Sequence, residues 1–156
     1  MTSEDGRFYF AYGNNMREQT MRERVGAQHY RFVCLAVLEG FRLTFTTTTP
    51  EWGGLVADLS EDSQGRVFGV LYEVDPQVWV ALAPHEPTYD RLLKTVHSLE
   101  EDAPPERTQA VVYRVSDANK EPEGPPEPRY LERILGAGIE RGLPDAYLEE
   151  LRQHRT

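Results

Sequence analysis

The sequence predicts an α+β fold: a small, mostly antiparallel β-barrel of about six or seven strands, with a few short helices packed outside it. Strand-like segments follow one another through the first two thirds of the chain, at 8–12, 31–38, 41–47, 55–59, 66–74, 89–99 and 108–115. Helical patterns are short and lie mainly in the last third. Because closure leaves no strand with an exposed edge, we expect a closed or nearly closed sheet for this many strands.

The first strand-like segment, 8–12, is almost wholly apolar and aromatic, and it stops at Gly13. A strand without polar alternation has both faces covered, so core packing holds the turn after it rigidly. Gly13 predicts a backbone conformation that other residues avoid. Asn15 and Glu18 have the spacing of a capping box, which predicts a helix beginning at Met16. The amides of such a turn, at the positive end of a helix, suit a carboxylate or an oxyanion; the alternative is a connection that binds nothing.

Two polar breaks divide the strands in the middle of the chain. The Glu-Gly pair at 39–40 ends one strand, and the next strand begins at Phe41. Residues 60–65 have the composition of a turn, which predicts that 55–59 and 66–74 pair with each other as a hairpin.

A helix follows the hairpin in this prediction. The pair Asp75-Pro76 is typical of a helix start, with aspartate as N-cap and proline at the first helical position. The helix runs to about Ala83, before Pro84. The side chains expected to face inward are Trp79, Val80 and Leu82.

Two more helices are predicted near the end of the chain. The segment 121–128 contains too many prolines for a helix or an interior strand, so it is expected to form a surface connection. Helical spacing then predicts a helix that ends at Gly142 and buries Leu131, Ile134, Leu135 and Gly138. A last helix begins at 143–145.

Composition excludes several classes of function. A chain of 156 residues predicts one domain, 1–156. Lys and Arg total 17 against 26 Asp and Glu, and this net charge of -9 argues against nucleic acid as a partner. Cys34 is the only cysteine, which predicts an inert buried thiol and a reducing compartment. Residues 1–7 do not resemble a signal peptide and no apolar run is long enough to span a membrane, so we expect a cytoplasmic protein with no membrane partner.

Few residues in the sequence are candidates for chemistry. The 4 histidines form no i, i+4 pair and have no cysteine cluster nearby, so we expect no metal. Glu86 lies between Pro84 and Pro87, in a rigid connection between a helix and a strand. Apolar surroundings raise the pKa of a carboxylate toward neutrality, as general acid–base chemistry requires; the alternative is a surface glutamate in a loop.

Motifs in one consistent order carry a resemblance to a known family. Tyr9-Phe10-Ala11-Tyr12-Gly13-Asn14-Asn15 resembles the Y-F-A-Y-G-S-N signature of the γ-glutamylcyclotransferase family, and the resemblance extends over residues 8–151. Residues 82–87 occupy the place of the family's L-D-x-x-E-G motif. Further segments resemble L-x-G-[YF]-x-L-x-F at 38–45, G-G-[IV]-A at 53–57, V-W-G-V-L-Y at 67–72, P-P-S-P-x-Y at 126–130, G-A at 136–137 and G-L-P-x-x-Y at 142–147.

This resemblance implies an enzyme of the acyltransferase or lyase type that uses no cofactor and no metal. Its partner is a small-molecule γ-glutamyl substrate, whose own α-amino group attacks the γ-amide carbonyl; the products are 5-oxoproline and a free amino acid or amine. The resemblance gives the proton transfer to Glu86 as the catalytic residue. It implies that Tyr130 closes over the site, that 122–128 form its rim, and that the glutamyl-binding loop consists of Tyr9, Phe10, Ala11, Tyr12, Gly13 and Asn14.

Three residues depart from the family pattern. Asn14 replaces a serine, Ala83 an aspartate, and Pro87 the glycine that follows the catalytic glutamate. Proline fixes φ where glycine leaves it free, which affects how Glu86 approaches a substrate. Three functions are therefore open: a cyclotransferase acting on γ-glutamyl amino acids or amines, a γ-glutamyl deprotecting enzyme of specialised metabolism, and a non-catalytic ligand-binding member of the family.

Overall fold

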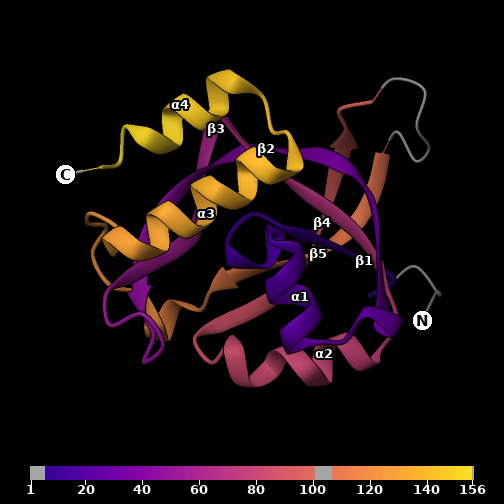
Figure 1. The fold of residues 1–156 in the computed structure, drawn as a ribbon. Helices are drawn as coiled ribbons and strands as arrows, with labels where there is room; N and C mark the ends of the chain where they lie inside the picture. The colour runs from indigo at the N-terminus through magenta and orange to yellow at the C-terminus, as the bar shows by residue number, and fades with distance from the viewer. Residues whose placement is uncertain (1–5, 101–106, 156) are drawn as a thin grey trace.

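In the part of the chain that the structure describes, five strands form a barrel that closes in the order β1-β3-β2-β4-β5 (Figure 1). The computed structural model of the chain describes residues 6–100 and 107–155. Its strands are β1 (Phe8–Ala11), β2 (Tyr30–Thr48), β3 (Leu55–Val74), β4 (Tyr89–Ser98) and β5 (Arg107–Val115). Strands β1 and β5 pair in parallel, and the other neighbours pair antiparallel. The predicted α+β, mostly antiparallel barrel is confirmed.

The barrel has fewer strands than expected because two of its strands are long. Strand β2 contains both segments predicted as 31–38 and 41–47. Strand β3 likewise contains 55–59 and 66–74. The expected hairpin between these last two segments is wrong, since both belong to β3 and pair with β2.

A bulge explains why turn-like residues lie inside both long strands. The pairing shifts where β2 passes Gly40: Phe41 pairs with Glu61, and residues 62–65 of β3 have no partner in β2. Gly40 has a φ of 88°, in the left-handed region that glycine adopts without strain. Glycine and polar residues are typical of turns, but in this protein they form a bulge inside two continuous strands.

The described residues form four helices that cover the barrel: α1 (Glu18–Arg24), α2 (Gln77–Leu82), α3 (Pro128–Arg141) and α4 (Asp145–Arg152). Short 3-10 turns lie at Asn14–Met16, Ala27–His29, Ala83–His85 and Asp117–Asn119. Figure 1 shows α3, in orange, crossing one side of the barrel, with α2 at the opposite end of this view. None of the helices that the structure describes is long and apolar enough to cross a membrane.

Helix α3 begins inside the proline-rich segment and is capped by Glu127. The Glu127 carboxylate accepts hydrogen bonds from the backbone N–H groups of Arg129 and Tyr130, at 2.6 and 3.0 Å. Gly142 ends the helix with a φ of 86°, as the sequence predicts. Glu127 thereby sets the point at which Tyr130 enters the first turn of α3.

Two expectations about helices are wrong. Helix α1 begins at Glu18 rather than Met16, and Asn15 does not cap it. In α2, Val80 is 65% exposed and Val78 is fully buried. Val78 and Leu82 are four residues apart and therefore share the inward face of the helix.

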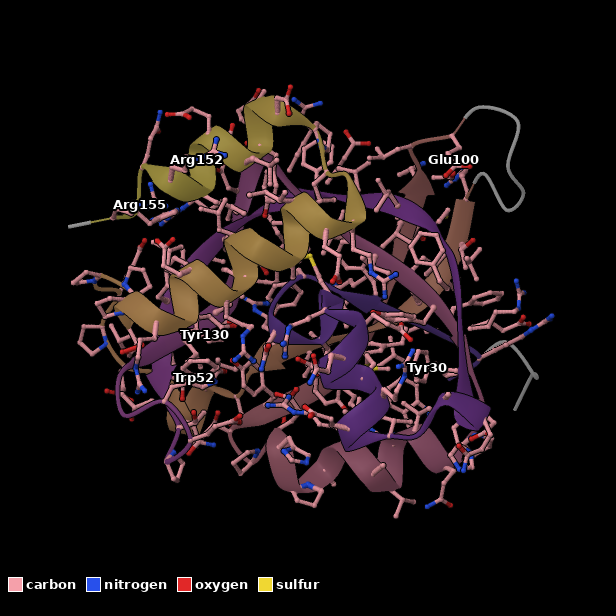
Figure 2. The ribbon with its side chains drawn as sticks, in the orientation of Figure 1. Tyr30, Trp52, Glu100, Tyr130, Arg152 and Arg155 are labelled. Atoms are coloured by element: carbon pink, nitrogen blue, oxygen red, sulfur yellow. The ribbon has the colours of Figure 1, made fainter. Side chains whose placement is uncertain are left out.

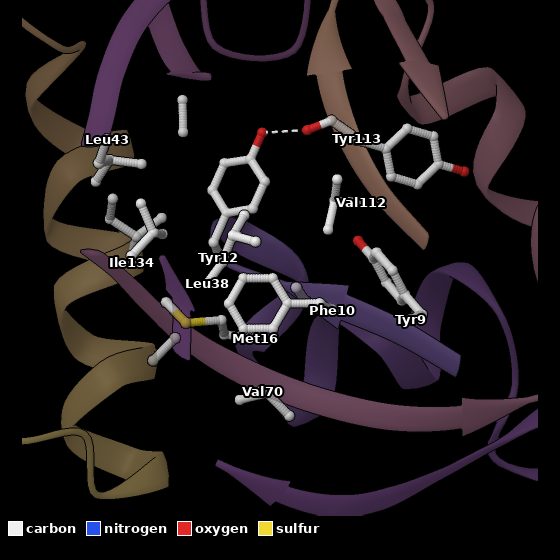
Figure 3. Close-up of a cluster of buried hydrophobic side chains, with 14 of the residues drawn as sticks. Tyr9, Phe10, Tyr12, Met16, Leu38, Leu43, Val70, Val112, Tyr113 and Ile134 are labelled. Carbon is white, nitrogen blue, oxygen red and sulfur yellow. Dashed lines mark hydrogen bonds between the residues drawn. The ribbon is translucent and has the colours of Figure 1, made fainter. Parts of the chain in front are cut away.

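Phe10 and Met16 are central to the core and have no exposed surface. Figure 3 shows both side chains in a buried cluster between the barrel strands and Ile134 of α3. At the edge of this cluster the Tyr12 hydroxyl donates a hydrogen bond to the backbone carbonyl of Tyr113. The segment that follows β1 is thus fixed both to the core and to β5.

Candidate active site

A cavity of about 50 Å³ lies where β1 ends and the chain turns toward α1. Its walls come from strands β1, β3, β4 and β5, from four helical segments and from the connection between β2 and β3. The lining residues are Tyr9, Phe10, Tyr12, Gly13, Asn14, Asn15, Arg24, Thr49, Glu51, Trp52, Val56, Ala57, His85, Glu86, Tyr89, Tyr113 and Tyr130.

The structure brings together nearly all the site residues expected from the sequence. Glu86, Tyr130 and the β1 turn line the same cavity, although they lie far apart along the chain. Ala11 is the exception: it is buried, and its carbonyl oxygen lies 2.3 Å from the position that a Cβ at Gly69 would occupy. Ala11 therefore serves the packing of β1 against β3 rather than the wall of the cavity.

Hydrogen bonds from the core hold the turn that follows β1. The Met16 N–H donates to the Gly13 carbonyl at 3.0 Å, which closes a 3-10 turn. The Tyr72 hydroxyl donates to the Asn15 carbonyl at 2.7 Å, and Arg141 of α3 donates to the Met16 carbonyl at 2.9 Å. Strand β3 and helix α3 thus fix this part of the cavity wall, as expected for a turn that follows a fully covered strand.

Gly13 is needed because another residue approaches it closely. Its φ is -122° and its ψ is -136°, so a left-handed conformation is not what requires glycine here. Instead, the Tyr130 hydroxyl oxygen lies 2.7 Å from the position that a Cβ at residue 13 would occupy. The same hydroxyl accepts a hydrogen bond from the Ala57 N–H at 3.3 Å. Tyr130 thereby joins α3 to β3 and to the β1 turn.

Glu86 ends the 3-10 turn after α2 and is half-buried against the cavity. Its Oε1 accepts a hydrogen bond from the Asn15 side-chain amide at 3.2 Å. The same Asn15 nitrogen donates to the Tyr9 hydroxyl at 2.9 Å. Burial raises the pKa of Glu86 to about 7, although the charge of Arg24 and the hydrogen bond from Asn15 act in the opposite direction. A carboxyl group with this pKa takes and releases a proton near neutral pH.

Aromatic rings surround the Glu86 carboxyl group. Tyr113 packs edge-on against Tyr9 and Tyr89, with ring centroids 5.8 and 6.2 Å apart. The Tyr89 hydroxyl donates to the Ala57 carbonyl. Burial raises the pKa of all three phenols, so they stay neutral where Glu86 titrates. The rings therefore supply the apolar surroundings that raise the pKa of Glu86.

The outer wall of the cavity joins the β2–β3 connection to α3. Trp52 packs edge-on against Tyr130, with ring centroids 5.3 Å apart, and Figure 2 shows the two side chains close together near the start of α3. Arg129 and Arg133 lie over the Trp52 ring at 5.9 and 5.5 Å from its centroid. None of residues 122–128, which were expected to form the rim, is among the lining residues, and the wall begins after them at Tyr130.

Several cavity residues were not predicted as site residues. Asn15 matched a local capping pattern, although its amide bonds Glu86 instead. Arg24 lies in the last turn of a short, partly buried helix, where an arginine has many ordinary uses. Tyr89 and Tyr113 follow the alternation of their strands, which predicts that they face inward but not that they face a cavity.

Comparisons with known proteins place these features in a family. The family model of Gamma-glutamyl cyclotransferase, AIG2-like proteins matches residues 9–132, which include β1, Glu86 and the first residues of α3. The chain belongs to this family, as the motifs of the sequence predict.

Individual relatives are distant in sequence and close in structure. A gamma-glutamylcyclotransferase of Mus musculus is 25% identical over 150 residues, which are 92% of this chain and 76% of the mouse protein. The solved structure of a gamma-glutamyl cyclotransferase has a TM-score of 0.81 at 25% identity and covers 93% of this chain and 85% of its own. An uncharacterized protein from Homo sapiens has a TM-score of 0.80 at 27% identity, with the same coverage.

Proposed function

We propose that this protein cyclises the γ-glutamyl part of a conjugate, releasing 5-oxoproline and a free amino acid or amine. The observation that carries the proposal is the position of Glu86, whose carboxyl group lies in one cavity with the β1 turn and has a pKa of about 7. Membership of the Gamma-glutamyl cyclotransferase, AIG2-like family supports the same reaction class.

The reaction needs no nucleophile from the protein. The substrate's α-ammonium group gives a proton to Glu86, and the resulting amine attacks the carbonyl carbon of the γ-amide. A C–N bond forms in the five-membered ring, and the original amide C–N bond breaks. In balance, the α-nitrogen loses two protons and the leaving nitrogen gains two: Glu86 carries one proton from the first nitrogen to the second, and the other is released to and taken from solvent. A group with a pKa near the working pH suits both transfers.

The remaining cavity residues hold the glutamyl chain in its folded conformation. We propose that Tyr9, Phe10, Tyr12, Gly13 and Asn14 bind the glutamyl group and that Tyr130 covers it. Holding the amine against the carbonyl removes much of the entropic barrier to ring closure. Burial in aromatic surroundings strengthens the polar contacts to the carboxylate and the oxyanion.

Release of 5-oxoproline from a panel of compounds tests this proposal. The panel contains γ-glutamyl amino acids, γ-glutamyl di- and tripeptides, and γ-glutamyl amines, each paired with its α-glutamyl isomer. We expect mass spectrometry to detect 5-oxoproline from at least one γ-glutamyl compound and from none of the α-isomers. Saturable binding of γ-glutamyl compounds without any 5-oxoproline would contradict the proposal and support a ligand-binding protein.

A further inference from the structure

We propose that Arg24 is a positioning residue, which orients the Asn15 amide and through it the Glu86 carboxylate. The catalytic consequence rests on the proposed function of Glu86, whereas the positioning itself rests on the contacts among these side chains. Arg24 comes from the last turn of α1, Asn15 from the β1 turn and Glu86 from the segment after α2. The Asn15 amide therefore links three separate segments of the chain.

The hydrogen bonds determine which way the Asn15 amide faces. One Arg24 nitrogen donates to Asn15 Oδ1 at 3.0 Å. A guanidinium group has no acceptor, so the side of the Asn15 amide that faces Arg24 has to be its oxygen. The NH2 group then faces the other way, and its two hydrogens reach Glu86 Oε1 at 3.2 Å and the Tyr9 hydroxyl at 2.9 Å. Without Arg24, only the ionised form of Glu86 would exclude the flipped amide, because a protonated Glu86 and the Tyr9 hydroxyl can both donate to an amide oxygen.

Arg24 is itself held in place by Glu51. Its second terminal nitrogen lies 2.8 Å from Glu51 Oε1. The Arg24 side chain is only 9% exposed, whereas that of Glu51 is 51% exposed. This ion pair differs from an ordinary surface pair because the Arg24 side chain is buried beside the cavity. One terminal nitrogen of its guanidinium group is held by Asn15 and the other by Glu51.

This orientation leaves one oxygen of Glu86 for chemistry. Among the residues that the structure describes, the Asn15 amide is the group that donates to the Glu86 carboxylate, and it donates to Oε1. Oε2 is therefore the oxygen that takes and returns the proton. A positioning residue that fixes Oε1 also fixes the direction in which Oε2 meets a substrate amine.

The charges that face Glu86 determine how its pKa should change when Arg24 or Glu51 is replaced. Burial raises the pKa of Glu86, the positive charge of Arg24 lowers it, and the negative charge of Glu51 raises it. Burial and the charge of Arg24 lower the pKa of His85, which also lines the cavity. The other titratable groups facing the cavity are phenols whose pKa values burial raises: Tyr9, Tyr12, Tyr89, Tyr113 and Tyr130.

Substitution of Arg24 by methionine and by lysine tests the proposal. We expect Arg24→Met to raise the pKa of Glu86 by about one unit and to lower kcat about ten-fold, because both the charge and the fixed amide are lost. Arg24→Lys keeps the charge and should retain a pKa close to that of the wild type. Glu51→Gln should lower the pKa of Glu86. The pKa is read from the carboxyl 13C signal of Glu86 during a pH titration, assigned with Glu86→Gln.

A double-mutant cycle separates positioning from charge. In an Asn15→Ala background, Arg24→Met should lower kcat no further, since Arg24 acts through Asn15, but it should still raise the pKa of Glu86. Arg22→Met is the matched control, because Arg22 lies on the same helix with its side chain 64% exposed. We expect that control to change neither quantity.

The side-chain NH2 signals of Asn15, read by 15N NMR, report the orientation of its amide without turnover. They therefore distinguish the failure of this proposal from the failure of the proposed function. In folded Arg24→Met we expect these signals to shift or broaden, because the amide is no longer held by its oxygen. Asn15 NH2 signals that match those of the wild type would overturn the proposal, whether or not the wild type releases 5-oxoproline. If Arg24→Met does not fold, as judged by circular dichroism, Glu51→Gln decides, since Glu51 holds Arg24 in place: altered Asn15 NH2 signals support the proposal, and unchanged signals contradict it.

Discussion

The hydroxyl oxygen of Tyr130 lies 2.7 Å from the position that a Cβ at Gly13 would occupy. Real Cβ atoms do not approach an oxygen so closely, so the first turn of α3 and the turn after β1 are matched to each other at this point. The match depends on Glu127, which fixes the start of α3, and on Tyr72, which fixes the carbonyl of Asn15.

Gly13→Ala should therefore disturb the cavity. We expect it to lower the free energy of unfolding by about 1–3 kcal/mol, because either Tyr130 or the β1 turn has to move. Urea denaturation measures this change. Adding Tyr130→Phe removes the clashing oxygen and should recover part of the loss.

Gly136→Ala is a matched control for this substitution. Nothing lies within 4 Å of a Cβ at Gly136, which is in the interior of α3. We expect this variant to be as stable as the wild type or up to about 1 kcal/mol more stable, because alanine favours the helix. Equal effects of the two glycine substitutions would show that the contact between Gly13 and Tyr130 has no importance for stability.

The raised pKa of Glu86 also predicts how stability varies with pH. Its pKa is raised from 4.5 to about 7 in the folded protein, so between these values the folded state holds a proton that the unfolded state has released. The contribution of Glu86 to stability is thus largest below pH 4.5 and is lost as the pH rises through about 7. The carboxylate opposes folding at alkaline pH.

Glu86→Gln should accordingly gain stability relative to the wild type as the pH increases. We expect the difference between the two unfolding free energies to change by about 1–2 kcal/mol between pH ~5.5 and pH ~8.5, in favour of the variant at the higher pH. Chemical denaturation at both pH values measures it. A difference that does not vary with pH would mean that Glu86 titrates normally.

A second buried carboxylate, Asp58, contributes to stability rather than to the cavity. It has no exposed surface and accepts hydrogen bonds from Thr46 at 2.7 Å and from the Val115 N–H at 2.9 Å. Lys120 Nζ lies 3.2 Å from Oδ2, the oxygen that also accepts from Thr46. The carboxylate thereby joins β2, β3 and β5 in the interior.

Asp58→Ala should be strongly destabilising, by about 3–5 kcal/mol, since it leaves donors and a lysine without their partner. Glu123→Ala is the control, because the Glu123–Arg42 ion pair is about half exposed and should contribute less than about 1 kcal/mol. Thermal and urea unfolding measure both variants. Similar costs for the two substitutions would rule out a structural role for the buried network.

The sequence predicts the barrel and most of the cavity because its strong local patterns favour the same strands and turns that the fold contains. The apolar strand before Gly13 and the rigid connection around Glu86 both lie where the motifs indicate. The ends of the strands were less predictable. Glycine with a positive φ, such as Gly40, occurs both in turns that end a strand and in bulges inside one. Ala11 belongs to the motif but packs against Gly69, outside the cavity.

The connections between cavity residues were beyond the reach of local patterns. Asn15 satisfies a helix-capping spacing, but its amide has a competing and better use between Arg24 and Glu86. Contacts with residues far along the chain determine which of these two roles Asn15 has. The residues next to Asn15 in the sequence do not include Glu86 and do not show that Glu86 is buried beside it.

The central claim is that Glu86 transfers the proton in a cyclisation, and one paired measurement tests it most directly. 5-Oxoproline release and binding of the same γ-glutamyl compound are measured for the wild type and for Glu86→Gln. Glutamine keeps the shape of the side chain but transfers no proton at neutral pH, so turnover should fall by about a hundred-fold or more while the Kd changes by less than about three-fold. Near-native turnover by Glu86→Gln would contradict the claim.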